Sequence, residues 1–100
     1  MKTRIVVENG TTHRYLVSSP LGNDDSNGVL HCEDGPAVEN LNGYKSWWQN
    51  GIRHRIDGPA VEFSKGGREY WIDGHVIHVN SLEEFLEHVK FWRVQQVLES

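Results

Sequence analysis

The sequence predicts a mainly β protein, an antiparallel meander of β-hairpins closed by one C-terminal α-helix. Three observations predict this fold. Turn dipeptides separate runs of about five residues, a common strand length; one 23-residue unit occurs twice; and the apolar period becomes helical after residue 80. One hundred residues suit a single domain, which we expect to span 1–100.

The turn dipeptides mark where the hairpins reverse. Type I′ turns need positive φ at both central residues, so Asn-Gly and Asp-Gly favour two-residue hairpin loops. The sequence contains Asn9-Gly10, Asn27-Gly28, Asp34-Gly35, Asn42-Gly43, Asn50-Gly51, Asp57-Gly58 and Asp73-Gly74, with Gly66-Gly67 in a corresponding place. We therefore predict a long loop from Ser18 to Ser26 and strands near 3–8, 11–17, 29–32, 36–41, 44–49, 52–56, 59–64, 68–72 and 75–79.

The repeated unit is the strongest signal. The segment 31–51 aligns without a gap on 54–74, and ten of the 21 aligned positions are identical. Fainter copies of Asn50–His54 occur at Asn9–His13 and Asn27–His31. We expect a degenerate N-terminal hairpin and loop at 1–28, then two repeats and a closing strand at 29–79, because stacked arrays need atypical end units. The repeat framework is expected to be His31, Asp34, Gly35, Pro36, Trp48, Asp57, Gly58, Pro59 and Trp71.

The last segment, 81–98, is predicted to be a helix. Ser81 followed by Glu84 forms a capping box, and apolar residues from Leu82 onward recur at helical spacing. The second half adds further apolar residues, which widens the apolar face beyond one stripe. We expect these additional apolar residues to form a surface for a partner or for a homodimer through the helix. The candidate binding residues on this surface are Phe91 and Trp92.

Composition and charge exclude several classes of protein. Ten basic residues against fourteen acidic ones give a net charge of −4, which disfavours nucleic acid as a ligand and suits protein partners. No apolar run approaches the ~20 residues of a transmembrane helix, so no membrane is expected. A single cysteine, Cys32, forms no intrachain disulfide. These features favour a soluble, cytoplasmic protein.

The repeat also resembles a known family. Its pattern, His-x-x-Asp-Gly-Pro-Ala-Val-Glu…Gly-x-Lys/Arg-x-Trp/Tyr-Trp-x-Asn/Asp-Gly, is similar to the MORN repeat in the MORN-like variant of phages and large viruses. The match runs from about Asn27 to His78. The resemblance implies a curved, single-layer antiparallel sheet that serves as a scaffold or binding surface. It further implies a small phage-encoded inhibitor of a host defence protein, acting in the host cytoplasm.

Two aromatic pairs occupy equivalent positions in the two repeats. Adjacent strand residues point to opposite faces, so Trp48 and Trp71 share one face and Trp47 and Tyr70 share the other. We expect the identical pair, Trp48 and Trp71, to pack the repeat core. Trp47 and Tyr70 are then the aromatic candidates for a binding surface.

The polar residues of the repeat have structural and chemical interpretations. His31 and His54 are expected to hydrogen-bond the neighbouring turns through Asp34 and Asp57, since Asp before Gly is a common turn choice. Glu39 and Glu62 are expected to pair with Lys45 and Arg68 across their hairpins. His75 and His78 point to opposite faces of a strand, and no spacing resembles a zinc site. We therefore expect no metal and no other cofactor.

One constellation suggests a ligand. If the sheet brings a set of aromatic and basic side chains to one face, their rings and guanidinium groups hold a nucleotide by stacking and phosphate contacts. The alternative is a basic strand exposed to solvent. The residues concerned are Trp47, Arg53, His54, Arg55 and Tyr70.

No catalytic fingerprint accompanies these features. The sequence has no nucleophile elbow, P-loop or dinucleotide motif, so enzyme activity is not expected. The first hypothesis is a non-enzymatic protein-binding module that blocks a host protein. The alternative is a sponge that sequesters a nucleotide-type small-molecule signal in an aromatic and basic pocket.

Overall fold

The computed structural model describes residues 2–17 and 28–99, and the chain is mainly β with one C-terminal helix. The loop expected from Ser18 to Ser26 lies outside these residues. The elements are β1 (Lys2–Glu8), β2 (Thr11–Val17), β3 (Gly28–Leu30), β4 (Val38–Asn40), β5 (Lys45–Ser46), β6 (Trp48–Gln49), β7 (Ile52–Arg53), β8 (Val61–Glu62), β9 (Arg68–Ile72), β10 (His75–Ile77) and α1 (Leu82–Glu99).

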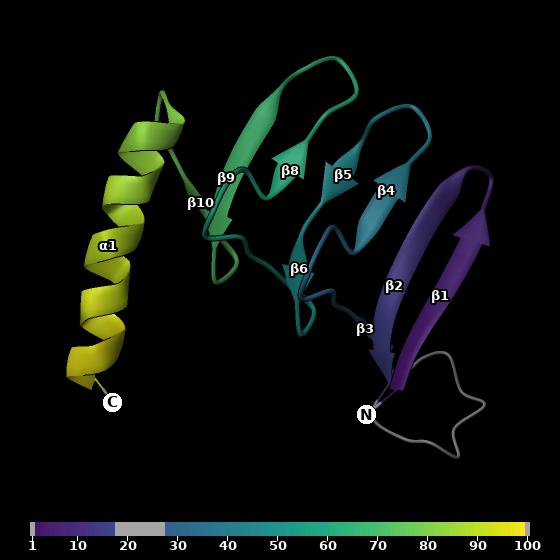
Figure 1. Ribbon diagram of the computed structural model, residues 1–100, viewed down its shortest axis with the longest axis horizontal. Coiled ribbons are helices and arrows are strands. Elements are labelled where there is room, and N and C mark those ends of the chain that lie inside the picture. The colour runs from purple at the N-terminus through teal and green to yellow at the C-terminus, as the bar shows by residue number, and fades with distance from the viewer. Residues whose placement is uncertain (1, 18–27, 100) are drawn as a thin grey trace.

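The strands form an antiparallel array in chain order. The main sheet runs β1-β2-β4-β5-β8-β9-β10, with β3 added to β2, and β6 pairs with β7 in a separate two-stranded sheet. Figure 1 shows β1 at one end of the array and β9 and β10 at the other, beside α1. The predicted antiparallel sheet followed by a helix is therefore confirmed.

Several strands are shorter than predicted, and one is divided. The strand expected at 44–49 is split into β5 and β6 at Trp47. The Trp47 amide donates to the carbonyl of Ala60 (2.8 Å), whereas its carbonyl accepts from the amide of His54 (3.1 Å). Because these two bonds run to different segments, the chain changes its pairing partner at Trp47.

The turn dipeptides of the described residues fall into three classes. In Asn42-Gly43 and Gly66-Gly67 only Gly43 and Gly66 have positive φ, so the two-residue turn predicted there was wrong. In Asn9-Gly10, Asn50-Gly51 and Asp73-Gly74, both residues have positive φ, as the hairpin prediction requires. Asp34-Gly35 and Asp57-Gly58 do not, so predicting the same turn type for them was wrong. In both segments a proline follows the glycine. A residue before proline is biased toward extended backbone, which removes the conformation that the turn needs.

The sequence repeat is also a repeat of backbone hydrogen bonds. The amide of Cys32 donates to the carbonyl of Trp48 (3.2 Å), and at the equivalent place in the next repeat Arg55 donates to Trp71 (3.1 Å). The same repeat offset relates the bond from Gly51 to Leu30 (2.8 Å) to the bond from Gly74 to Arg53 (3.0 Å). Residues that the repeat aligns therefore occupy equivalent places in successive units.

A further copy of the unit lies at the N-terminal end, in a different alignment from the expected one. The amide of Arg14 donates to Ala37 and its carbonyl accepts from His31. Trp47 makes the corresponding bonds to Ala60 and His54. Arg14 thus corresponds to Trp47. His13 lies opposite Val38 on β4, as Ser46 lies opposite Val61 on β8, so matching His13 with His54 was wrong.

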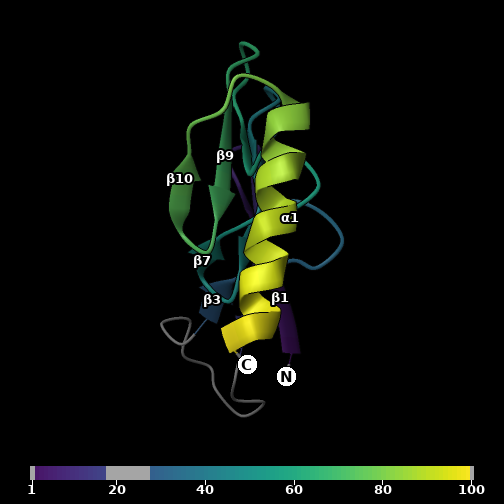
Figure 2. The same cartoon turned by 90° about the vertical axis from the view of Figure 1, so that its left-hand side faces the viewer.

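The helix begins where predicted and packs on the last unit. The Ser81 hydroxyl accepts from the Glu84 amide (3.2 Å), and the Glu84 carboxylate accepts from the Asn80 amide (3.1 Å). Phe85 and Val89 are buried against Ile72 of β9. Figure 2 shows α1 at this end of the array.

Among the described residues, no helix is long and apolar enough to cross a membrane.

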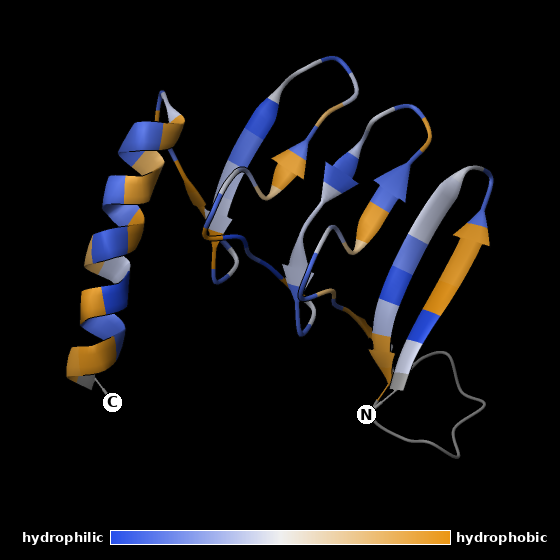
Figure 3. Cartoon of the chain, in the orientation of Figure 1, coloured by the Kyte–Doolittle hydropathy of each residue, from blue (hydrophilic) through white to orange (hydrophobic). Residues whose placement is uncertain are grey.

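The second half of α1 leaves apolar side chains exposed. Phe91, Val97 and Leu98 are 72%, 73% and 78% exposed, while Phe85 is fully buried. Figure 3 shows apolar colour on the last turn of α1 and on β1.

The described chain measures 42 × 39 × 18 Å, so the array is thin and most side chains reach water.

Candidate functional site

A groove of about 810 Å³ opens on the side of the array that bears Trp47. Both Asp-Gly-Pro segments, the β6–β7 hairpin and the segment after β7 contribute to its walls. The lining residues that define its chemistry are Glu33, Asp34, Trp47, Gln49, Ile52, His54, Arg55, Ile56, Asp57 and Asp73.

The groove is acidic. Four of its lining residues carry a carboxylate, namely Glu33, Asp34, Asp57 and Asp73, and only Arg55 carries a guanidinium. The side chains of Glu33 and Asp57 are 85% and 80% exposed, so their charges face solvent at the rim. Clefts lined by one sign of charge raise the local concentration of ligands of the opposite sign. The lining therefore favours a cationic ligand.

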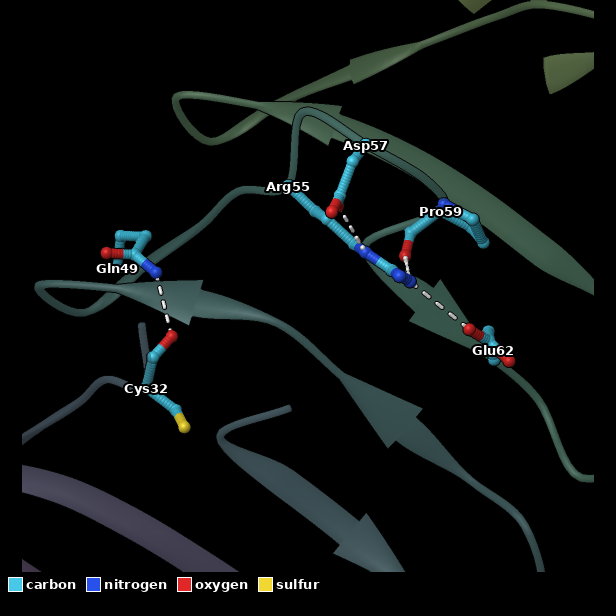
Figure 4. A network of polar contacts seen from close by, with 6 residues as sticks. All are labelled: Cys32, Gln49, Arg55, Asp57, Pro59 and Glu62. Carbon is cyan, nitrogen blue, oxygen red and sulfur yellow. Dashed lines mark hydrogen bonds and ion pairs between the residues drawn. The ribbon is translucent and has the colours of Figure 1, made fainter. Parts of the chain in front are cut away.

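Arg55 is fixed by four contacts, three of which appear in Figure 4. Its Nε donates to Asp57 Oδ1 (2.9 Å), and its Nη1 donates to the Pro59 carbonyl (3.0 Å) and to Glu62 Oε2 (3.3 Å). Its Cζ lies 3.8 Å from the ring centroid of Trp47. Two carboxylates thus already neutralise this guanidinium, and the guanidinium in turn holds the Trp47 ring in place.

The expected cross-strand ion pairs, Glu39–Lys45 and Glu62–Arg68, are not formed, although each pair lies in register. Instead, Glu39 Oε1 accepts from Arg14 Nη2 (3.1 Å), just as Glu62 accepts from Arg55. Both glutamates are partly buried, and a forked guanidinium satisfies a half-buried carboxylate better than an exposed lysine does.

The two repeat histidines bind the backbone of hairpin turns. Asn50 donates its amide to Nδ1 of His31 (2.9 Å), and Asp73 donates its amide to Nδ1 of His54 (3.0 Å). Each histidine therefore braces a turn, as predicted. The turn that is braced is the one that closes a hairpin, β6–β7 for His31 and β9–β10 for His54. The expected partners, Asp34 and Asp57, were wrong, because these carboxylates accept from Cys32 and Arg55 instead.

The other arginine of the expected ligand constellation points to the opposite face. Arg53 Cζ lies 4.7 Å and 4.9 Å from the ring centroids of Trp48 and Trp71, so the cation is held between two indoles. Its Nε is buried without a hydrogen-bond partner. Trp48 and Trp71 are half-buried and pack together on this guanidinium from equivalent positions of the two repeats. Arg53 does not join Arg55 in one site.

The remaining candidates lie at or near α1. Tyr70 is half-buried, and its ring packs at a tilt against Phe85 at 4.6 Å between centroids, which makes it part of the helix contact. Trp92 donates its Nε1 to Asp73 Oδ2 (3.1 Å), and its ring lies 5.5 Å from that of His54 between centroids. Phe91 is exposed. The groove thus brings together Trp47, His54 and Arg55 and leaves the other candidates outside.

The surroundings of Cys32 disfavour its thiolate form. Its Sγ donates to Asp34 Oδ1 (3.3 Å). Partial burial, followed by this hydrogen bond, raises the pKa of the Cys32 thiol above its ordinary value, which lowers the thiolate fraction at neutral pH. Among residues 2–17 and 28–99, no three His, Cys, Asp or Glu side chains are grouped to hold a metal ion.

Sequence patterns missed several groove residues, of which Glu33, Gln49 and Asp73 are the most polar. Asp73 was expected only as a turn residue, whereas Glu33 and Gln49 lie at variable positions of the repeat and differ in type from their equivalents. Glu33 and Gln49 correspond to Ile56 and Ile72 of the following repeat. A polar residue replacing an apolar one within the repeat was the available signal.

In comparisons with known proteins, no family model, no curated protein and no solved structure matches the chain.

Proposed function

We propose that the chain is a non-enzymatic protein-binding module whose groove receives a basic segment of a protein partner. The observation that carries the proposal is the lining of the groove, where three carboxylates, of Glu33, Asp34 and Asp73, accompany the Arg55–Asp57 ion pair. Trp47 and Ile52 add apolar surface between these charges. Such a combination of an aromatic anchor and a charged rim is typical of binding sites for proteins.

The resemblance of the repeat to the MORN-like variant supports a scaffold role for the array. If the phage-type variant is the right relative, the partner is a host protein, and a small cytoplasmic inhibitor of a defence protein is the corresponding function.

The groove chemistry disfavours the alternative of a nucleotide sponge. A nucleotide would place its phosphates near four carboxylates, and the single arginine there already binds Asp57 and Glu62. Arg53, the second expected cation, lies on the other face. We therefore expect no binding heat when mixed ribonucleotides are titrated into the protein in a calorimeter. Stoichiometric binding that is lost in Arg55→Ala would restore the sponge.

The protein-binding proposal is tested by quantitative capture from bacterial lysate with three tagged baits. These are the wild-type chain, Glu33→Arg in the groove, and Glu8→Arg on β1. Both glutamates are exposed, so both variants should fold, and they change charge equally. We expect a protein retained near 1:1 by wild type and Glu8→Arg and lost with Glu33→Arg. Equal retention by all three baits, or no specific retention, contradicts the proposal.

A further inference from the structure

The groove is the repeat equivalent of the site where α1 binds. On the sheet side, α1 packs on Ile56, Tyr70, Ile72, Ile77 and Val79. The residues one repeat earlier are Glu33, Trp47, Gln49, His54 and Ile56. All five of them line the groove. The array therefore presents the same site twice, once filled by its own helix and once open.

From this equivalence we infer that the groove binds an α-helix, and that its occupant is a basic amphipathic helix of a protein partner. The inference rests on the proposed function and names the form of the bound segment. The backbone around both sites is matched, because the bonds from Cys32 to Trp48 and from Gly51 to Leu30 recur at the equivalent places of the next repeat.

The spacing of the two sites suits a pair of helices. Each unit adds two strands to the main sheet, since the equivalents β5 and β9 are separated by β8. Neighbouring strands lie about 4.8 Å apart, so the sites are roughly 10 Å apart. Packed helices have interaxial distances of about 8–10 Å. A helix in the groove would therefore lie alongside α1 at an ordinary packing distance.

The side chains specify the chemistry of the incoming helix. The aromatic and one aliphatic position are kept, with Trp47 in place of Tyr70 and Ile56 in place of Val79. The other three positions become polar: Ile56 is replaced by Glu33, Ile72 by Gln49 and Ile77 by His54. The occupant thus needs a narrow apolar row toward Trp47 and basic side chains toward Glu33 and the aspartates at the rim.

A second copy of α1 does not meet this requirement. Its first turn carries Glu83 and Glu84, which would face an acidic groove. Its inward row, Phe85 and Val89, is fully apolar and matches the isoleucines of its own site. Like charges and unpaired polar groups at an interface are unfavourable. The partner helix is therefore basic where α1 is acidic.

The probe is a peptide with the sequence of residues 82–99 in which three residues that flank the inward row are changed to lysine: Glu84→Lys, His88→Lys and Gln95→Lys. A matched peptide adds Phe91→Pro, which keeps the charge and the inward row but breaks the helix. Both are titrated by fluorescence anisotropy at low salt into full-length wild type, Glu33→Arg and Glu8→Arg.

We expect the lysine peptide to bind wild type and Glu8→Arg equally, and to lose at least tenfold in affinity with Glu33→Arg or with the proline substitution. If both peptides bind equally and only Glu33→Arg weakens them, the helix inference is overturned while the acidic binding groove stands. If neither peptide binds, or if Glu33→Arg has no effect, the inference is also overturned, and the lysate experiment decides the proposed function separately.

Discussion

At the scale of single residues, Arg55 links more of the groove wall than its sequence position suggests. One guanidinium binds two carboxylates, one carbonyl and one indole ring. The fork geometry of arginine allows this, and lysine cannot reproduce it. In the preceding repeat the equivalent acceptors, Pro36 and Glu39, bind Arg14 of β2 instead. The array thus fills one structural role from two different sequence positions.

Arg55→Lys should therefore destabilise the protein despite keeping the charge. Loss of the forked contacts and of stacking on Trp47 is expected to lower the free energy of unfolding by about 1–2 kcal/mol. Urea unfolding followed by circular dichroism measures it. Arg93→Lys, on the exposed side of α1, is the matched control and should change stability little. Equal stability of the two variants would contradict the bridging role of Arg55.

The Cys32 thiol provides a pH prediction at the same scale. Its pKa is raised by burial and then by Asp34, so the thiolate forms at higher pH in the folded chain than in the unfolded one. The pH midpoint of iodoacetamide alkylation should lie above that of the urea-unfolded protein. Asp34→Asn removes the carboxylate that disfavours the thiolate and should shift the midpoint down. An unchanged or higher midpoint in the variant would refute this explanation.

Residue partners were the least predictable part of the structure. The positions of His31 and His54 were evident from the repeat, but their hydrogen-bond partners depend on which turn approaches the imidazole. Likewise, the sequence repeat does not align Arg14 with Arg55, although both bind equivalent acceptors. Such contacts arise from tertiary geometry that local patterns do not encode.

At the scale of elements, α1 has two faces with different roles. Phe85 is fully buried on the sheet, whereas Phe91 is 72% exposed. The capping residues Ser81 and Glu84 made the start of the helix predictable. The hairpins were predictable for a similar reason, because Asn9, Asn50 and Asp73 adopt the positive φ that their turns require.

The two phenylalanines allow a matched comparison. Phe85→Ala should lower the free energy of unfolding by about 3–5 kcal/mol, the usual cost of emptying a buried phenylalanine site. Phe91→Ala should cost little, because its ring already contacts water. Thermal unfolding of both variants measures the difference. Similar losses for the two variants would mean that α1 does not pack as described.

At the scale of the whole molecule, the sequence repeat made the order of strands predictable but not the groove. The repeat determines which backbone segments are equivalent in successive units. In the last unit, α1 covers the site that these segments form. Among the described residues α1 covers the last unit alone, and this arrangement, which leaves the groove open, is a property of the assembled array. The role of Glu33 and Gln49 in the groove becomes evident only from the structure, in which their repeat equivalents, Ile56 and Ile72, pack against α1.

The most direct test of this account is to record the indole N–H signals of the four tryptophans of the ¹⁵N-labelled protein by NMR while the unlabelled lysine-substituted helix peptide is added. Trp47 lines the groove and Trp92 bonds Asp73 of its lining, whereas Trp48 and Trp71 stack on Arg53 on the opposite face. The account predicts shifts at Trp47 and Trp92 and unchanged signals at Trp48 and Trp71. Shifts at Trp48 and Trp71 with Trp47 unmoved would contradict it.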